Sequence, residues 1–178
     1  MALKRTLVLG GARSGKTARA LVLCDAIPVR TYLATAQGRD DEMQARIKAH
    51  QVERGSCWNT IEEPMDLTGV LRGHSHGNAA TGNDDERVVL VDCLTLWLSN
   101  VMFADKDVRL EIRELVNVIA DYRGNLVIVS NEVGMGLVPD TKVGRTFRDA
   151  QGLVNQKVAE VVDIVEFVVA GVPMRVKP

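Results

Sequence analysis

Residues 10–17 read Gly10-Gly11-Ala12-Arg13-Ser14-Gly15-Lys16-Thr17 and match the pattern GxxxxGK[ST]. This segment follows an apolar run from Thr6 to Leu9 and opens a helix-like stretch from Lys16 to Asp25. A strand before the pattern and a helix after it are the context that identifies a phosphate-binding loop. The glycines let successive backbone N–H groups point inward, and these donors, with the positive end of the helix dipole, bind an anion. The segment is therefore predicted to hold the phosphates of a nucleoside triphosphate, with a plain glycine-rich turn as the alternative.

Two side chains of this loop and one further carboxylate have expected tasks at the phosphates. Lys16 is expected to reach the β and γ phosphates, and the Thr17 hydroxyl is expected to ligate Mg²⁺. Asp92 ends the apolar strand from Val88 to Val91, where a second residue on the Mg²⁺ side would lie. A carboxylate at a strand end is also a common turn or cap residue. The metal role of Asp92 therefore depends on the phosphate loop.

Apolar runs and helix-like stretches alternate along the rest of the chain, as is typical of an α/β protein with a parallel sheet. Further strands are predicted at Thr31 to Ala34, Val88 to Val91, Leu126 to Val129 and Ile164 to Ala170, with an antiparallel hairpin strand at Val172 to Lys177. Further helices are predicted at Asp41 to Arg54, Val108 to Tyr122 and Thr146 to Val162. The length of 178 residues fits one domain, which is expected to span residues 1–178.

Composition narrows the class of partner. The formal net charge is -1, with 46% hydrophobic and 25% charged residues, which indicates a globular protein without the field that attracts nucleic acid. Cys24, Cys57 and Cys93 form no CxxC pair, which argues against a disulfide framework and against a zinc site. The apolar run from Leu7 to Leu9 is too short for a signal peptide or a membrane span. A cytoplasmic location is expected.

One polar segment, Arg72 to Arg87, is rich in Gly and Asn and is predicted to be a mobile surface loop without an assigned role. His74 and His76 lie within it. An HxH pair without further nearby ligands is a weak metal pattern. Both histidines are expected to be exposed to solvent.

The predicted helix from Asp41 to Arg54 carries His50 where an apolar stripe meets a basic one. His50 is spaced i+4 from Arg46 and i−4 from Arg54, so the three lie on one side of the helix. One interpretation is a boundary histidine that packs its ring against the core. The other is a nucleophile, because neighbouring guanidiniums favour the neutral imidazole and help to hold a triphosphate. Spacing alone leaves both open.

Longer blocks, in order along nearly the whole chain, carry a family resemblance. They are GGARSGKT (10–17), YLATAQ (32–37), DDEMQARIKAHQVER (40–54), WNTIEEP (58–64) and NEVGMGLVPDTKVGRTFRDAQGLVNQ (131–156). In these blocks the chain resembles the bifunctional adenosylcobinamide kinase/adenosylcobinamide-phosphate guanylyltransferases of cobalamin biosynthesis, the CobU/CobP family. The resemblance implies a RecA-like P-loop NTPase fold, a mostly parallel sheet flanked by helices.

The resemblance also implies site residues. It implies that His50 attacks the α-phosphate of GTP to form a covalent GMP-histidine. Guanine-nucleotide contacts are implied for Gly10, Gly11, Ala12, Arg13, Ser14, Gly15, Lys16, Thr17, Ala34, Thr35, Ala36, Gln51, Val52, Glu53, Arg54, Glu62 and Asp92. Some members have Glu at the Asp92 position and a second His at the Ala49 position. The shorter carboxylate leaves its metal contact open, and Ala49 makes His50 the single candidate nucleophile.

Two reactions with Mg²⁺ follow from the resemblance. Adenosylcobinamide is phosphorylated with ATP or GTP, and GMP from GTP is then transferred to adenosylcobinamide phosphate to give adenosylcobinamide-GDP. A homo-oligomer is also implied, a trimer in known members. From the residues alone two other functions stay open, namely a P-loop kinase without a covalent intermediate and a nucleotide-dependent switch module.

Overall fold

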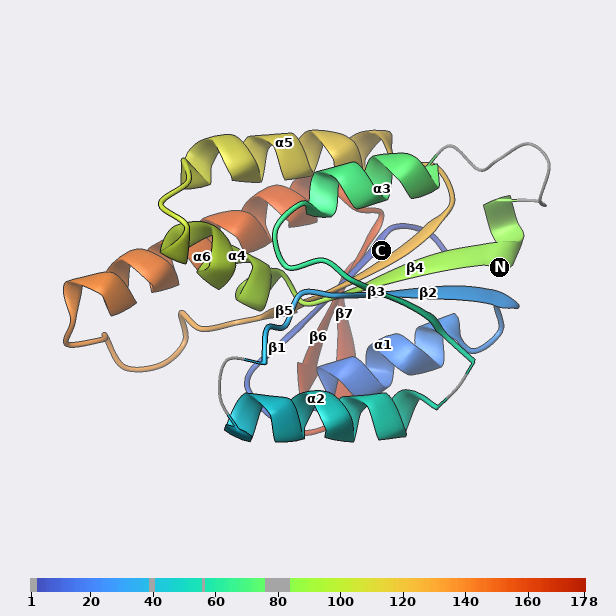
Figure 1. Cartoon of the computed structure of the whole chain (residues 1–178), viewed down its shortest axis with the longest axis horizontal. Helices are drawn as coiled ribbons and strands as arrows, with labels where there is room; N and C mark the ends of the chain where they lie inside the picture. Colours follow the sequence, from blue (N-terminus) through green and yellow to red (C-terminus); the bar gives the residue numbers. More distant parts are fainter. Residues whose placement is uncertain (1–2, 39–40, 56, 76–83) are drawn as a thin grey trace.

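The computed structural model describes residues 3–38, 41–55, 57–75 and 84–178. Seven strands form one sheet in the order β3-β2-β4-β5-β1-β6-β7 (Figure 1). The strands are β1 (Thr6–Gly10), β2 (Val29–Ala34), β3 (Asn59–Glu62), β4 (Arg87–Asp92), β5 (Asn125–Asn131), β6 (Ile164–Val169) and β7 (Val172–Lys177). The helices are α1 (Lys16–Cys24), α2 (Asp41–Arg54), α3 (Leu67–Ser75), α4 (Leu94–Phe103), α5 (Val108–Asp121) and α6 (Lys142–Val161), with a 3-10 turn at Asp84–Glu86.

Every neighbouring pair from β3 to β6 is parallel, and β7 alone in this sheet is antiparallel to its neighbour, as predicted. The carboxyl ends of the parallel strands therefore meet at one edge. The register aligns Glu62, Ala34 and Asp92 across β3, β2 and β4, and aligns Gly10 with Asn131 across β1 and β5. In α/β sheets this edge is where ligands bind.

Both faces of the sheet are covered by helices. Figure 1 shows α3, α4, α5 and α6 on one side and α1 and α2 on the other. Alternate side chains of β1 follow this division, since Leu7 packs in the core with α3 to α6 and Val8 packs in the core with α1. A strand that is buried on both faces must be apolar at successive positions. This is why the central strands could be recognised as continuous aliphatic runs.

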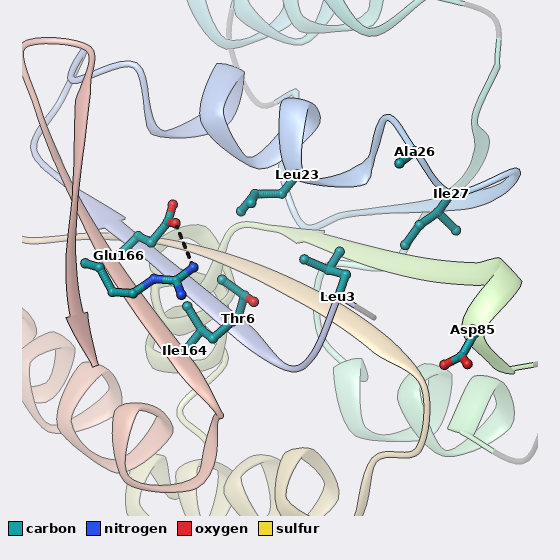
Figure 2. A pocket seen from close by; sticks show the side chains of 9 residues that line it. Leu3, Thr6, Leu23, Ala26, Ile27, Asp85, Ile164 and Glu166 are labelled. Atoms are coloured by element: carbon teal, nitrogen blue, oxygen red, sulfur yellow. Dashed lines mark ion pairs between the residues drawn. The ribbon is translucent and has the colours of Figure 1, made fainter. Parts of the chain in front are cut away.

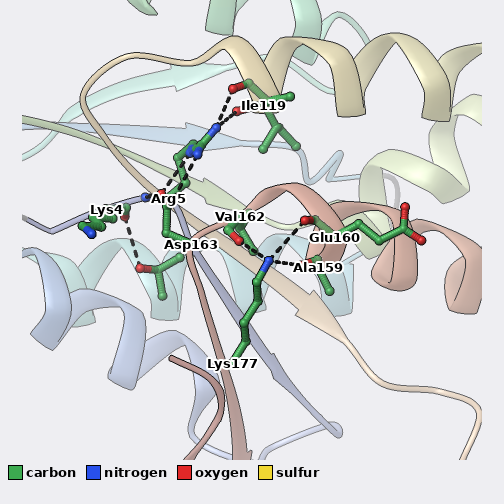
Figure 3. Close-up of polar contacts among 10 residues, drawn as sticks. Lys4, Arg5, Ile119, Ala159, Glu160, Val162, Asp163 and Lys177 are labelled. Carbon is green, nitrogen blue, oxygen red and sulfur yellow. Dashed lines mark hydrogen bonds and ion pairs between the residues drawn. The ribbon is translucent and has the colours of Figure 1, made fainter.

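Cationic side chains from other elements close the carboxyl ends of two helices (Figure 3). The Arg5 guanidinium binds Asp163 at 3.0 Å and also donates to the main-chain carbonyls of Ile119 and Ala120 at the end of α5. The Lys177 ammonium donates to three carbonyls at the end of α6, at 2.6 to 3.1 Å. Terminal carbonyls lack partners within their own helix, and a cation there also opposes the helix dipole. These contacts fix α5 and α6 to the sheet.

The prediction of a surface loop from Arg72 to Arg87 is wrong at both ends. Helix α3 continues to Ser75, whose hydroxyl accepts a hydrogen bond from the Arg123 N–H at 3.0 Å. At the other end a 3-10 turn leads into β4 at Arg87. The expected exposure of His74 is also wrong, because its ring is half-buried with Nδ1 at 2.9 Å from the carbonyl oxygen of Val70. Residues 76–83, with His76, lie outside the described part.

Candidate active site

The loop between β1 and α1 has a conformation that requires glycine at two positions. Gly15 has φ of 91° directly before α1, in the left-handed region that only glycine adopts without strain. A Cβ on Gly10 would overlap Ser14 Oγ and lie 2.8 Å from the carbonyl oxygen of Val168. The chain thus turns tightly from the end of β1 into α1, with the free N–H groups of the first turn of α1 at the carboxyl edge of the sheet.

The turn of the β6–β7 hairpin packs directly against this loop. The N–H of Gly171 donates to the carbonyl oxygen of Ser14 at 2.8 Å. A Cβ on Gly15 would lie 3.2 Å from the Cα of Gly171. Ala170 and Gly171 both have positive φ, of 51° and 81°, and such pairs build the tight turns of two-stranded hairpins. No role was predicted for this turn, and its signal in the sequence is Gly171, which directly follows the predicted strand from Ile164 to Ala170.

Lys16 is half-buried at the first position of α1. Its ammonium donates to the carbonyl oxygen of Gly11 at 3.0 Å, within the loop itself. Burial lowers the pKa of the Lys16 ammonium, while the nearby Cys93 and Asp92 raise it by a smaller amount. A lysine with little water around it interacts more strongly with an entering phosphate, because the local dielectric constant is low.

Asp92 lies near the phosphate loop at the carboxyl edge of the sheet, although β5 separates β1 from β4. The Thr17 hydroxyl is 3.4 Å from Asp92 Oδ2, and the Tyr32 hydroxyl donates to the same oxygen at 2.6 Å. Among the described residues no group of three or more His, Cys, Asp or Glu could hold a metal ion. Thr17 and Asp92 do supply hard oxygen ligands side by side, and Mg²⁺ typically takes one or two such protein ligands together with substrate phosphates. The donor set therefore fits Mg²⁺.

The segment Ala34 to Ala36 continues this edge. Thr35 is fully buried, and its hydroxyl donates to the Cys93 carbonyl and accepts from the Cys93 N–H, both at 2.8 Å. Its own N–H donates to the carbonyl oxygen of Asp92 at 3.1 Å. The Thr35 side chain thus fixes the chain after β4 and is not available to a nucleotide, whereas Ala34 and Ala36 are half-buried. Glu62 is exposed at the end of β3, beside Ala34.

Helix α2 includes the remaining predicted site residues. Gln51 and Val52 are exposed. The side chains of His50, Glu53 and Arg54 lie outside what the structure describes, so only their position on the helix is known. The chain enters α2 from the carboxyl end of β2 and leaves it toward the amino end of β3, so α2 runs antiparallel to these strands. With a rise of about 1.5 Å per residue, the backbone of His50 is about 13 Å along the helix from Asp41.

Buried polar side chains of β5 and α6 fix the neighbouring strand end. Ser130 donates to Asn155 Oδ1 at 2.7 Å, and the Gln151 amide donates to Ser130 at 2.9 Å. Asn155 in turn donates to the main-chain carbonyl of Asn131 at 3.0 Å. The next N–H, that of Glu132, donates to the carbonyl oxygen of Gly10 at 3.1 Å, so this network reaches the first residue of the phosphate loop.

Two cavities lie away from these residues. One of about 440 Å³, shown in Figure 2, is lined by Leu23, Thr6, Ile164 and Glu166 among others. Thr6 and Ile164 begin their strands, so this cavity is at the amino edge of the sheet, opposite the phosphate loop. The phosphate site is an open edge with backbone donors, which suits a highly charged ligand better than an enclosed apolar pocket does.

The topology and the loop together define a P-loop nucleotide-binding protein of the α/β class. Solved structures agree, as the chain is similar to a DnaB-like replicative helicase, with a TM-score of 0.52 at 13% identity over 92% of this chain and 46% of that one. It is also similar to a prototypical ATPase from a type III secretion system of pathogenic bacteria, with a TM-score of 0.55 at 13% identity over 92% and 50%. At such identity the likeness concerns the fold alone, and the expected RecA-like P-loop fold is confirmed.

Sequence comparison identifies the family. Residues 6–176 match the model of the family described as cobinamide kinase / cobinamide phosphate guanyltransferase. The chain is 41% identical to the bifunctional adenosylcobalamin biosynthesis protein CobP of Pseudomonas aeruginosa over 177 residues, which cover 97% of each chain. It is 36% identical to the corresponding CobU protein of Escherichia coli, over 96% of this chain and 98% of that one. The chain belongs to this family, and the expected resemblance is confirmed.

Proposed function

We propose that this enzyme of cobalamin biosynthesis phosphorylates adenosylcobinamide with ATP or GTP and then transfers GMP from GTP through a histidine to give adenosylcobinamide-GDP. The observation that carries the proposal is the family match over residues 6–176 on a chain whose Lys16 and Thr17 lie beside Asp92. Both reactions need a triphosphate held at one edge of the sheet. Residues 1–178 would act as one domain.

In the kinase step the hydroxyl oxygen of adenosylcobinamide attacks the γ-phosphorus. A bond forms between these atoms, the bond to the bridging oxygen of the β-phosphate breaks to release the nucleoside diphosphate, and the hydroxyl proton passes to solvent. Lys16 would give up its contact with Gly11 and neutralise the negative charge of the β and γ phosphates. The backbone N–H groups from Gly10 to Thr17 would orient the phosphate chain.

Thr17 and Asp92 would hold Mg²⁺, which supplies positive charge against the phosphate oxygens. The proposal is supported by their oxygens, which are 3.4 Å apart next to the phosphate loop. The remaining ligands would be phosphate oxygens and water. Ala34, Ala36 and Glu62 would contact the nucleotide from the neighbouring strand ends, and Thr35 would hold the segment between the two alanines in place.

In the guanylyl step a ring nitrogen of His50 attacks the α-phosphorus and pyrophosphate leaves. A phosphate oxygen of adenosylcobinamide phosphate then attacks the same phosphorus, and the N–P bond breaks to free His50. Gln51, Val52, Glu53 and Arg54 follow on the same helix and would contact the guanine nucleotide. Because α2 runs away from the carboxyl edge and His50 lies toward its far end, the helix would move relative to the sheet to bring His50 to the α-phosphate.

The test is covalent labelling with α-labelled GTP and Mg²⁺, followed by denaturation and peptide mapping. A phosphoramidate on histidine is lost in mild acid and survives alkali, unlike a serine or threonine ester. The label is expected on the peptide that contains His50. His50→Ala should abolish both the label and guanylyl transfer, yet leave the phosphorylation of adenosylcobinamide largely intact, because that step puts a substrate hydroxyl on phosphorus.

An acid-labile adduct in the His50→Ala protein, or adenosylcobinamide-GDP formed at the parent rate, would refute the assignment of His50. A P-loop kinase without a covalent intermediate would give phosphorylation and no label in the parent. A nucleotide-dependent switch would give no cobinamide-dependent turnover at all. The three functions that the sequence left open are thereby separated in one set of assays.

A homo-oligomer in the cytoplasm is the proposed state, with a trimer as the specific expectation. Its support is a segment between β5 and α6 whose apolar side chains face solvent, including Met135 at 80% and Leu137 at 96% exposure. Burial of such residues against another subunit would remove apolar area from water. No helix among the described residues has the length and apolar character needed to cross a membrane.

A further inference from the structure

We propose that Tyr32 is a positioning residue of the phosphate site, whose hydroxyl fixes the orientation of the Asp92 carboxylate. The inference rests on the proposed placement of Mg²⁺ at Thr17 and Asp92. Tyr32 donates to Asp92 Oδ2 at 2.6 Å, within the short range of hydrogen bonds to a carboxylate. Thr17 approaches the same oxygen at 3.4 Å, which is long for a hydroxyl donor. Tyr32 is therefore the stronger of the two donors.

The two donors occupy one oxygen of the Asp92 carboxylate and leave the other available. Among the described residues, both donors to the Asp92 side chain use Oδ2, so Oδ1 remains an acceptor. Each carboxylate oxygen can accept about two hydrogen bonds. With Oδ2 saturated by Tyr32 and Thr17, Oδ1 is the oxygen left for the metal ion or for a water bound to it. Without the Tyr32 hydroxyl the carboxylate would be free to rotate, and either oxygen could turn toward Thr17.

Tyr32 is held rigidly enough for this task. Tyr32 lies on β2 two positions before Ala34, and Ala34 is aligned with Asp92 on β4. Because side chains alternate along a strand, the ring of Tyr32 and the carboxylate of Asp92 lie on the same face of the sheet. The side chain is only 4% exposed, in the core that α1 covers. Trp58 packs edge-on against the ring, with centroids 5.8 Å apart and planes at 86°. The Arg30 guanidinium lies 5.9 Å from the Trp58 ring and completes the stack.

Tyr32→Phe removes one hydroxyl and keeps the buried ring, so it tests the hydrogen bond alone. We expect Mn²⁺ to bind about tenfold more weakly to the GTP complex of this variant, the loss typical of a hydrogen bond to a charged group. Binding is measured from the electron paramagnetic resonance signal of free Mn²⁺, in a His50→Ala background so that no adduct forms. Affinity for GTP without metal should be unchanged. Unchanged tryptophan emission, to which Trp58 and Trp97 both contribute, would verify that the packing of Trp58 on the ring is intact.

Tyr122→Phe is the matched control, because Tyr122 is the other tyrosine and is also buried, at the end of α5. Its Mn²⁺ affinity should equal that of the parent. In an Asp92→Asn background Tyr32→Phe should cause no further loss, since Tyr32 acts through Asp92. A full additional tenfold loss in that background would overturn the inference.

The Mn²⁺ affinities of the variants distinguish the role of Tyr32 from the placement of the metal ion at Asp92. Parent-like Mn²⁺ binding by Tyr32→Phe, together with weakened binding by Asp92→Asn, would overturn the role of Tyr32 and leave the metal placement standing. Parent-like binding by Asp92→Asn would overturn the metal placement and the inference with it. Neither result depends on whether His50 carries GMP.

Discussion

At the scale of single residues, internal contacts orient the side chains of the phosphate site, and a ligand would replace these contacts. The Lys16 ammonium bonds to Gly11 of its own loop, and the Thr17 hydroxyl points toward Asp92. Burial of Lys16 removes water that would otherwise screen its charge. An entering triphosphate would therefore exchange one carbonyl partner of Lys16 for oxygens with full negative charge, and this exchange would favour binding.

Lys16→Ala should lower the rates of both adenosylcobinamide phosphorylation and guanylyl transfer by at least about 100-fold, because both reactions need the phosphate charge neutralised. Initial rates with saturating nucleotide measure this effect. Lys157→Ala serves as the control, since Lys157 pairs with Glu160 on the surface of α6. Near-parent rates of either reaction in folded Lys16→Ala protein would contradict the placement of the phosphates.

At the scale of elements, the hairpin of β6 and β7 supports the phosphate loop through its turn. The N–H of Gly171 donates to the carbonyl oxygen of Ser14, and the two backbones approach so closely that a Cβ on Gly15 would lie 3.2 Å from the Cα of Gly171, tighter than an ordinary contact. Gly171 has φ of 81°, and a Cβ there would meet no atom within 4 Å. Substitution at this position would therefore strain the turn without a steric clash.

Gly171→Ala is expected to lower the free energy of unfolding by about 1 kcal/mol, the usual cost of a side chain at positive φ. The same substitution should weaken GTP binding severalfold, because the strained turn shifts its contact with Ser14. Denaturant unfolding and calorimetric titration with GTP measure the two effects. Gly124→Ala is the control, at φ of 102° between α5 and β5, where a Cβ would make only ordinary contacts. It should lose stability and keep its GTP affinity, and equal loss of affinity in both variants would argue against the hairpin contact.

Elements with a strong local pattern could be predicted, and those defined by packing could not. The run from Thr6 to Leu9 and the phosphate loop are recognisable because a buried parallel strand and a glycine-rich turn each have a distinctive composition. Helix α4 is mostly apolar and buries even Thr95 and Asn100, since it lies between the sheet and α5, and so it lacks the period of an amphipathic helix. Strand β3 is short, polar and exposed at the edge of the sheet. Helix α3 contains two glycines that mask its helical character.

The candidate site likewise contains residues that a motif predicts and residues that only the packing of the strands brings together. The roles of Lys16, Thr17 and Asp92 were expected from one motif and one strand end, and the fold brings all three together. Tyr32 stood in a recognised block but received no role, because only the pairing of β2 with β4 brings its hydroxyl to Asp92. Thr35 was expected to contact nucleotide, and its hydroxyl is instead saturated by Cys93. Pairing between strands distant in sequence is the information that the motifs lack.

At the scale of the whole molecule, one buried ion pair joins the two ends of the chain. Arg19 of α1 binds both oxygens of Glu166 on β6, at 2.7 and 2.9 Å, and Arg175 of β7 lies 3.6 Å from the same carboxylate. The Glu166 side chain is 4% exposed. The Arg19 hydrogen bond and charge hold the pKa of Glu166 below its ordinary value. The pair thus fixes α1, the helix that follows the phosphate loop, to strands β6 and β7.

Glu166→Gln should lower the free energy of unfolding by about 2 kcal/mol at pH 7, as is typical for a lost hydrogen bond between charged groups. Because the folded pKa of Glu166 is lowered, its contribution is complete above the unfolded value of about 4.3 and is lost as the pH falls through the folded value. Urea unfolding of parent and variant should therefore differ at pH 7 and converge in acid. Glu160→Gln, which breaks an exposed pair, should change stability by less than about 0.5 kcal/mol at either pH. A parent–variant difference that persists undiminished in acid would contradict the ion pair as its source.

The contact between Gly171 and Ser14 has a consequence for the order in which the protein is made. The phosphate loop precedes its partners along the chain, because β1 pairs with β5 and β6, and the N–H of Gly171 donates to Ser14 across more than 150 residues of sequence. A strand cannot pair with partners that have not yet left the ribosome, and contacts of such large sequence separation form slowly. A nascent chain therefore carries the phosphate-binding motif long before it can bind a nucleotide, and the capacity to bind arises only after the hairpin of β6 and β7 has been synthesised.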